Sequence, residues 1–355
     1  MSAPVAPGGV DHGRPVRVVR GRGGRFSRRL DLRTGAVCGV LLLVALAVGV
    51  VALTTGDYPL SVGQVLAALT GTADGPERMI VLEWRLPRAL LALVLGAALG
   101  ASGAIFQSLT RNPLGSPDVI GFNTGAYTGA LVVLMVIGGG YGGVAAGALV
   151  GGIASAAIVY VLAYRKGVQG FRFVVVGIAV SAMLASVNAW LVITADLETA
   201  MAATLWGAGS LNGTSWAQAG PATVLVVVLL VATGFLAPRM RMLELGDDAA
   251  TALGLRPEPA RLALVVVGVA LIAVVTAAAG PISFVALAAP QLARRLTGGA
   301  GVQILPAAVM GAVLLSASDL VAQRLLAPTQ LPVGVVTVVL GGAYLVWLLV
   351  REARR

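Results

Sequence analysis

Long apolar stretches alternate with short polar intervals along this sequence of 355 residues. A helix needs about 20 apolar residues to cross the hydrocarbon core of a bilayer, and most of the stretches have about that length. The pattern therefore predicts an all-α polytopic membrane protein with ten spanning helices, of which the eighth is the shortest. The expected spans are residues 35–54, 89–109, 119–138, 142–163, 173–194, 215–236, 262–279, 283–297, 303–325 and 334–350.

The polar interval 238–261 separates two of these spans, and in a membrane protein such an interval must contact either water or a partner protein. Within it, Gly246 and Asp247 precede a short run that ends at Gly254. Asp near the start and Gly just past the end are typical caps of a short helix, and Pro257 keeps that helix separate from the next span. We interpret the helix as a docking site for a cytosolic protein; a solvated connector without a partner is the alternative.

The docking helix is expected to expose a small apolar surface with two carboxylates at its N-terminus. The exposed side chains would be Ala249, Ala250, Ala252 and Leu253, beside Asp247 and Asp248. The segment that we expect to couple to the partner is Gly246, Asp247, Asp248, Ala249, Ala250, Leu253 and Gly254.

Positive charge is concentrated on one side of the predicted helices. The net charge is +10, and eight arginines lie in residues 1–34, which have no hydrophobic period and are expected to form a disordered cytosolic tail near the lipid. Ten spans put both termini on the same side, and most other arginines then also fall on that inner side. The charges thus favour a multi-pass protein of the cytoplasmic membrane over a nucleic-acid-binding protein. The expected parts are the tail 1–34, one ten-helix domain 35–351 and a cytosolic C-terminus 352–355.

Three residue types are so scarce that they exclude several kinds of chemistry. Cys38 is the only cysteine, so no internal disulfide and no cysteine metal cluster can form. His12 is the only histidine and lies in the tail, which leaves no Ser–His pair and no zinc site in the spans. Lys166 is the only lysine and Gly167 follows it, so the chain has no Walker A sequence, and any ATP must be bound by another chain. A membrane-embedded enzyme is therefore the poorest interpretation, and no cofactor or metal is expected on this chain.

Two breaks interrupt the spans at corresponding corners on opposite faces. Residues 112–117 (Asn-Pro-Leu-Gly-Ser-Pro) follow the second span, and residues 280–283 (Gly-Pro-Ile-Ser) follow the seventh. Such a pair indicates two inverted halves, spans two to five and seven to ten. Irregular backbone near a bilayer is tolerated where it lines a water-filled cavity, so both corners are candidates for a pathway. Ordinary hairpin turns are the alternative for either corner alone.

Ionisable residues inside the spans, which mark proton or ion relays, are almost absent. Asp319, near the outer end of the ninth span and one turn before Gln323, is the clearest, and we interpret it as an interhelical hydrogen-bonding residue. This disfavours an ion-coupled secondary transporter, although a sodium site made of carbonyls and hydroxyls would leave no such trace.

Small residues at helical spacing, such as Gly96, Gly100 and Gly103, would let neighbouring helix backbones approach closely. Biased composition is the alternative explanation for them.

A series of motifs occurs in order between about residues 57 and 350. They are Arg85–Arg88 (RLPR) with Gly96, Gly100, Gly103 and Gln107, Arg111–Ala126 (RNPLGSPDVIGFNTGA), Trp206–Leu211 (WGAGSL), Leu245–Leu255 (LGDDAATALGL), Gly280–Arg295 (GPISFVALAAPQLARR), Ser318–Arg324 (SDLVAQR) and Leu331–Gly342 (LPVGVVTVVLGG). Together they resemble the permease family of ABC importers for iron-siderophore complexes, haem and cobalamin.

The resemblance implies a ten-helix subunit with inverted repeats, paired with a second permease subunit around one central pathway. It also implies that a cytosolic ABC ATPase dimer, which holds ATP and magnesium, docks on the interval 238–261. An extracytoplasmic binding protein would deliver cargo and meet Arg85, together with Arg88; anchoring to lipid headgroups is the alternative for Arg88. The residues that resemble the family's gates and pathway are Asn112, Leu114, Gln169, Gly170, Phe171, Trp206, Ser210 and Pro281.

Gln291 departs from many relatives, which have histidine after the proline of the eighth span. The change resembles a branch associated with ferric catecholate siderophores such as enterobactin, in which the permease commonly has a non-identical partner. The resemblance therefore favours a ferric siderophore as cargo and a heterodimer over a homodimer. Cobalamin or haem import is the alternative within the family.

Overall fold

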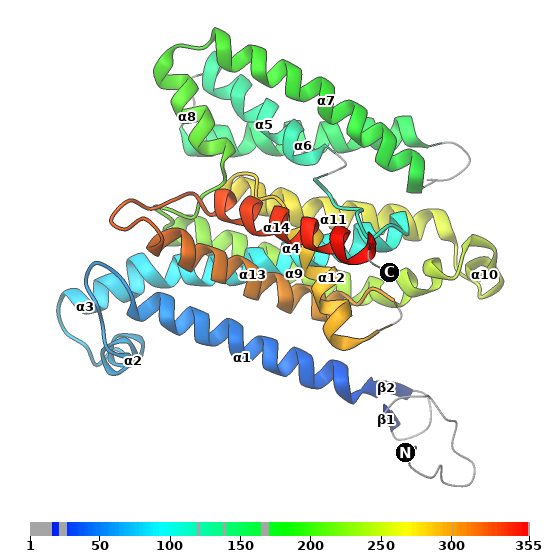
Figure 1. The fold of residues 1–355 in the computed structure, drawn as a ribbon, viewed down its shortest axis with the longest axis horizontal. Coiled ribbons are helices and arrows are strands. Elements are labelled where there is room, and N and C mark those ends of the chain that lie inside the picture. The colour runs from blue at the N-terminus through cyan, green and yellow to red at the C-terminus, as the bar shows by residue number, and fades with distance from the viewer. Residues whose placement is uncertain are drawn as a thin grey trace.

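The computed structural model describes residues 16–20, 27–118, 121–137, 140–164, 170–299 and 301–353. It is a bundle of helices, most of which run side by side along one direction (Figure 1). The ten predicted stretches correspond to α1 (Leu32–Thr54), α4 (Leu86–Thr110), α5 (Phe122–Val132) with the π-helical η2 (Val133–Ile137), α6 (Tyr141–Ala163), α7 (Gly170–Thr194), α9 (Trp216–Glu244), α11 (Pro257–Ala279), α12 (Val285–Thr297), α13 (Ile304–Arg324) and α14 (Val333–Ala353).

The lengths of these helices confirm the prediction of a polytopic all-α fold. Among the described residues, seven helical stretches are long and apolar enough to cross a membrane, and Phe122–Ile137 and Val333–Trp347 are shorter apolar helices. The eighth predicted span, α12, has only 13 residues and joins neither group. It packs against α4 and α13, and the carbonyl of Ala286 on α12 lies next to Gly103 of α4.

Short helices lie between the spans. They are α2 (Val62–Thr70), α3 (Pro76–Met79), the π-helical η1 (Ile80–Arg85), α8 (Leu197–Gly207) and α10 (Asp247–Ala252). The side chain of Ser61 accepts a hydrogen bond from the N–H of Gln64, and the side chain of Gln64 accepts one from the N–H of Ser61, so the pair forms a capping box that starts α2. Asp196 caps α8 by accepting from the N–H of Thr199, and this hydrogen bond lowers the pKa of the exposed Asp196 carboxyl.

The N-terminal tail contains regular structure that the sequence analysis did not expect. The strands β1 (Val16–Arg20) and β2 (Ser27–Asp31) pair antiparallel, with Val16 opposite Asp31 and Arg20 opposite Ser27. The β-branched valines of β1 favour an extended conformation. Helix α1 then begins at Leu32, inside the predicted tail, because the side chain of Asp31 accepts from the N–H groups of Arg33 and Thr34.

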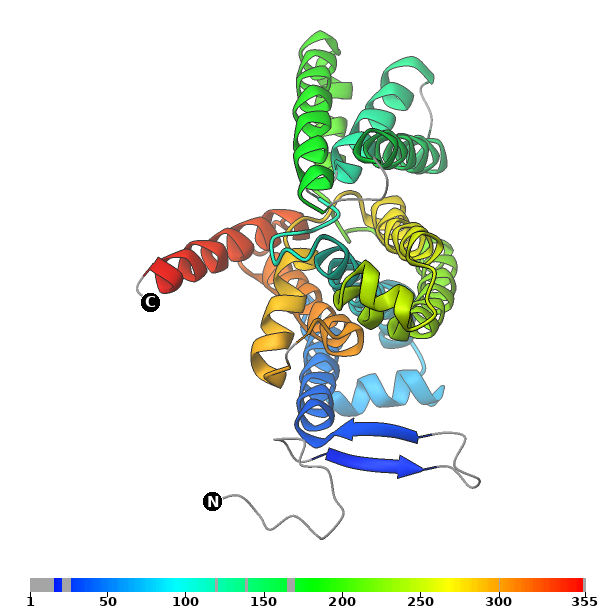
Figure 2. The ribbon, with the colours of Figure 1, turned by 90° about the vertical axis from the view of Figure 1, so that its right-hand side faces the viewer.

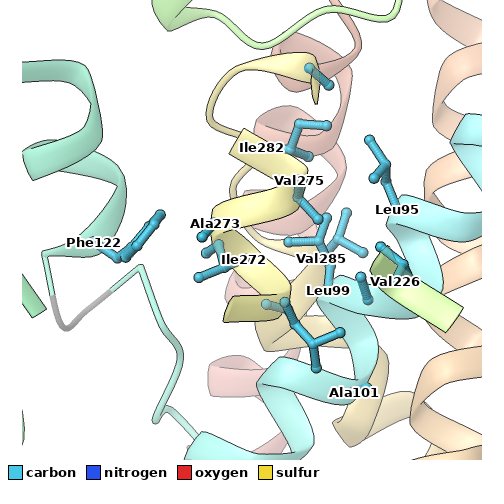
Figure 3. Packing of buried hydrophobic residues seen from close by; sticks show 14 of the residues in the cluster. Leu95, Leu99, Ala101, Phe122, Val226, Ile272, Ala273, Val275, Ile282 and Val285 are labelled. Carbon is cyan, nitrogen blue, oxygen red and sulfur yellow. The ribbon is translucent and has the colours of Figure 1, made fainter. Parts of the chain in front are cut away.

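Helix α4 forms the centre of the bundle and is buried along most of its length. Its leucines, including Leu95 and Leu99, meet side chains of α9, α11 and α12 in one apolar core (Figure 3). On another face α4 packs against α13 with almost no space between the backbones. A Cβ on Gly100 would lie 2.1 Å from the carbonyl oxygen of Ala307, so only glycine fits there. This confirms the close helix approach that the small residues predict.

The arrangement of neighbours agrees with two inverted halves. In that scheme α4–α7 correspond to α11–α14, and α4 packs on α13 while α11 packs on α6, the exchanged pair. Helices α5, α6, α7 and α8 stand together on one side of the bundle, and α1 with the hairpin lies on the opposite side (Figure 2). The two predicted corners, between α4 and α5 and between α11 and α12, therefore both adjoin the central helices.

Candidate docking helix and pathway corners

The interval between α9 and α11 contains the predicted docking helix, α10, bounded by Gly246 and Gly254. Both glycines have positive φ, 108° and 84°, a backbone conformation that other residues rarely adopt. Ala249, Ala252 and Leu253 are exposed, with Leu253 60% accessible. The expectation that Ala250 is exposed is wrong. Its side chain is fully buried, because α10 lies on α9 and α11 along that face.

Charged side chains fasten α10 to its surroundings. The carboxylate of Asp247 accepts from Arg261 at 2.8 Å and 3.0 Å, and Arg261 also donates to Glu258 at 2.9 Å. A second guanidinium, that of Arg111 at the end of α4, lies 3.6 Å from Asp247. Asp247 therefore links the docking helix to both α11 and α4, while Asp248 is exposed.

The C-terminal end of α4 contacts α9 as well. Arg111 has φ 51° and ends α4 in the left-handed conformation, and its guanidinium donates to the carbonyl of Leu243 at 3.0 Å. One turn earlier, the hydroxyl of Ser108 donates to Glu244 at 2.8 Å. Arg111, which directly precedes the first corner, thus contacts both α9 and the docking helix.

The first corner, residues 112–117, turns sharply and rests on α12. The side-chain oxygen of Asn112 accepts from the N–H of Leu114 at 2.9 Å, and Leu114 is 45% exposed. The amide of Gln291 donates to the carbonyl of Pro113, and Gln107 of α4 donates to the carbonyl of Leu287 at 2.9 Å. Gln291 therefore bonds directly to this gate candidate.

The second gate segment predicted from sequence is only partly described. Gln169 lies outside the described residues, and Gly170 is the first residue of α7. The side chain of Phe171 is 83% exposed.

Three segments that are distant in sequence meet at the second corner. The N–H of Ser210 donates to the carbonyl of Ala279 at 2.7 Å, and the N–H of Gly334 donates to the carbonyl of Gly209 at 3.0 Å. Gly209 has φ 67°, and a Cβ there would lie 2.3 Å from the carbonyl oxygen of Pro281. Trp206 stacks on Tyr127 of α5, with ring centroids 6.4 Å apart. The structure thus brings together the segments that hold Trp206, Ser210 and Pro281, and their role in a pathway stays a prediction.

A cavity of about 550 Å³ lies at the other end of the bundle from α10 and is lined by residues of η1, α4, α13 and their loops, including Glu83, Trp84, Arg85, Arg88, Gln323 and Arg324. Arg85 donates to the carbonyls of Leu53 and Tyr58, at 2.7 Å and 2.5 Å. It therefore holds the loop after α1 in place while it lines the cavity.

Arg88 is engaged by other side chains of the same cavity. It forms three hydrogen bonds to Asp319, at 3.3 Å, 3.0 Å and 2.9 Å, and a fourth to Gln330 at 2.7 Å. Gln323 also donates to Asp319, at 2.8 Å. This confirms Asp319 as an interhelical hydrogen-bonding residue.

The Arg88–Asp319 pair is expected to contribute to stability, because the two side chains are only 12% and 3% exposed. Asp319→Ala leaves a buried guanidinium without its anion and should lower the free energy of unfolding by about 3–5 kcal/mol. The double variant Arg88→Met/Asp319→Leu should recover most of that loss. Denaturant unfolding of the purified chain in detergent measures both effects.

Asp57→Ala is the matched control for this prediction, since Asp57 is 84% exposed and lies 4.0 Å from Arg324. It should leave the unfolding midpoint unchanged. Equal midpoints for Asp319→Ala and the unaltered chain would contradict a structural role for the pair.

One polar contact between the corners has no counterpart in the sequence analysis. The carboxylate of Asp118, just past the first corner, accepts from Asn123 at 2.5 Å and from the N–H of Phe284 at 3.4 Å. The only signal in the sequence is an acidic residue next to the start of a span, and that signal does not indicate a partner 166 residues away.

Comparison with known proteins assigns the chain to a family. A family model described as the FecCD transport family matches residues 41–351. The chain belongs to the FecCD transport family. This FecCD chain is 51% identical over 329 residues to the ferric enterobactin transport system permease protein FepG of Escherichia coli (strain K12), which covers 93% of this chain and 98% of that protein.

Two further comparisons extend the family assignment. The FecCD chain is 36% identical over 352 residues to the achromobactin transport system permease protein CbrC of Dickeya dadantii (strain 3937), covering 97% of this chain and 98% of that protein. A solved structure of a metal-chelate type ABC transporter in an inward-facing conformation matches with a TM-score of 0.77 and 25% identity, over 90% of this chain and 99% of that chain. Both the docking helix and the two corners lie within the matched family region.

Proposed function

We propose that this FecCD chain is the membrane-spanning permease subunit of an ATP-driven importer in the cytoplasmic membrane, with a ferric siderophore as cargo. The observation that carries the proposal is the 51% identity to a ferric enterobactin permease along 98% of that protein. Haem is an alternative cargo, since the hemin transport system permease protein HmuU of Yersinia pestis is 34% identical over 282 residues. Cobalamin remains a further alternative.

The motor of this importer is a separate cytosolic ABC ATPase dimer, which holds the ATP and magnesium. Its docking surface is the exposed face of α10, formed by Ala249, Ala252 and Leu253. This proposal places α10 and both termini in the cytosol, in agreement with the positive-inside distribution of arginines. Only a difference in contact between the two states of the ATPase dimer can drive the permease between its conformations.

The transmission of that movement follows the contacts of α10. Displacement of α10 pulls on Asp247 and, through it, on Arg111 at the end of α4. Arg111 directly precedes the first corner, where Asn112 and Leu114 are the gate candidates. The pathway then opens alternately to the outer and the inner side. The cargo passes as a large iron chelate between weakly attractive surfaces, and the chain does not bind bare iron.

The outer cavity lined by Arg85 and Arg88 is the proposed docking region for an extracytoplasmic binding protein. Both guanidinium groups form hydrogen bonds within the chain. They therefore contribute to docking by setting the shape of the cavity and by giving its lining a positive charge. Arg324, 33% exposed, adds a third positive charge to the same lining. Acidic side chains on the binding protein would complement this region.

A second permease subunit completes the pathway, and we propose that it is a non-identical chain. The support is Gln291, whose presence resembles a branch in which two different permeases pair. The lipid bilayer covers the remaining exposed apolar surface, which includes Ile178, Met183 and Ile193 of α7.

The cargo is tested by uptake into cells that carry the complete importer, with and without this chain. Radiolabelled ferric enterobactin should accumulate at least about tenfold faster than a ferric hydroxamate, haem or cobalamin, a preference of about 1.4 kcal/mol. Deletion of this chain should remove the uptake. Saturable uptake of haem or cobalamin, with none of the catecholate, would overturn the choice of cargo and leave the family assignment intact.

A further inference from the structure

The carboxylate of Asp118 connects the two inverted halves at their corners. Asp118 follows the first corner, and its Oδ2 atom accepts from the backbone N–H of Phe284 at 3.4 Å, at the end of the second corner. Its Oδ1 atom accepts from Asn123 of α5 at 2.5 Å. The side-chain oxygen of Asn123 in turn accepts from the hydroxyl of Thr276 on α11 at 3.4 Å. One polar chain thus joins the start of α5 with α11 and with the start of α12.

The backbone that Asp118 contacts is in an unfavourable conformation. Phe284 has φ 69°, which only glycine adopts readily, so surrounding contacts must hold it there. Its side chain packs against Gly341 of α14, where a Cβ would lie 2.3 Å from the Cβ of Phe284. Its N–H lies at the N-terminal end of α12, where the helix dipole favours a negative charge. The carboxylate of Asp118 therefore helps to fix the turn from which α12 starts.

An ionisable side chain within a membrane-spanning bundle is unfavourable and is expected to have a function. Asp118 lies seven residues after Arg111, which contacts Asp247 of the docking helix. Gln291 on α12 bonds the same corner at Pro113. The first corner is therefore attached to the docking helix at one end and to α12 at two points.

We propose that Asp118 is a positioning residue for transport: it fastens the first corner to the start of α12, so that both corners move together when α10 is displaced. This inference rests on the proposed function as an ATP-driven permease. Without the carboxylate, the ATPases would still bind and hydrolyse ATP, but less of the movement of the first corner would reach the second, because only Gln291 would then join the corner to α12.

The test uses the complete importer reconstituted in liposomes, with its ATPases, paired permease and binding protein, and radiolabelled ferric enterobactin as the probe. Asp118→Ala should retain ATPase association and basal ATP hydrolysis. Uptake should fall about tenfold, and the stimulation of ATP hydrolysis by the loaded binding protein should fall about fivefold, within the usual range of coupling between sites. The variant Asp74→Ala removes an exposed carboxylate between α2 and α3, outside the lining of the outer cavity, so it should keep both activities and serves as the control.

Asp118→Asn provides a second variant of the same shape that keeps one acceptor oxygen, and its coupling should be intermediate. Unchanged uptake and stimulation in Asp118→Ala would overturn the inference, as would failure of both variants to assemble, which would make Asp118 a folding residue. If the unaltered complex shows no ATP-driven uptake of the probe, the proposed function itself fails, and this result is distinct from both.

Discussion

Leu253→Arg on α10 is expected to abolish co-purification of the permease with its ATPase while leaving the folded chain in the membrane. Leu253 is 60% exposed, at the end of the small apolar face of α10, and makes the largest contribution to that face. A charged side chain at the end of this apolar docking face should weaken association by about 2–4 kcal/mol, as substitutions at interface hot spots do. That loss is about 30-fold to 1,000-fold in affinity.

Leu197→Arg, at the start of α8, is the matched control because Leu197 is also exposed, at 78%, and α8 belongs to the opposite end of the bundle. Pull-down of the ATPase from detergent extracts measures the difference between the two variants. Normal ATPase recovery with Leu253→Arg, or equal loss with Leu197→Arg, would contradict docking on α10.

Arg111→Ala is expected to give the opposite combination, with the ATPase bound and transport impaired. The pair with Asp247 is 3.6 Å long, and the two side chains are 55% and 50% exposed, so its loss should change stability by less than about 1 kcal/mol. Arg111 also loses its hydrogen bond to the carbonyl of Leu243, which leaves the first corner attached to the docking helix by the chain alone. Uptake should fall about tenfold, within the range of coupling energies between sites.

Arg241→Ala is the control for charge alone, since Arg241 is an exposed arginine near the same end of α9. Both quantities are measured on the same preparations: uptake reports on coupling, and recovery of the ATPase reports on docking. Full uptake with Arg111→Ala would show that movement of α10 does not pass through Arg111, and loss of the ATPase would make Arg111 part of the docking surface.

The spans could be predicted from the sequence because apolar length alone sets which segments can cross a bilayer. The C-terminal end of α10 could be predicted as well, since Gly254 has positive φ just past it. The predicted cap by Asp247 is wrong, because Asp247 is the first residue of α10 and its carboxylate accepts from Arg261 of α11. Which face of α10 is exposed could not be predicted, because burial of Ala250 depends on how α10 lies on α9 and α11. Such packing is decided by segments that are remote in sequence.

For the same reason, the partners of Arg88 and of the two corners could not be predicted from the sequence. Arg88 was assigned to docking from its motif, but its anion, Asp319, is 231 residues away and belongs to α13. The contacts of Gln291 with Pro113 and of Asp118 with Phe284 span 178 and 166 residues. Local patterns indicated the corners, whereas the side chains that connect the two halves became identifiable only in three dimensions.

The central claim is that this chain is a conduit driven by a separate ATPase, and the energy source for uptake tests it most directly. The complete importer in liposomes should accumulate radiolabelled ferric enterobactin only when the ATPase is present and ATP is available to it. Collapse of the proton gradient with an uncoupler should leave that uptake unchanged. Uptake that continues without the ATPase and stops with the uncoupler would contradict the account.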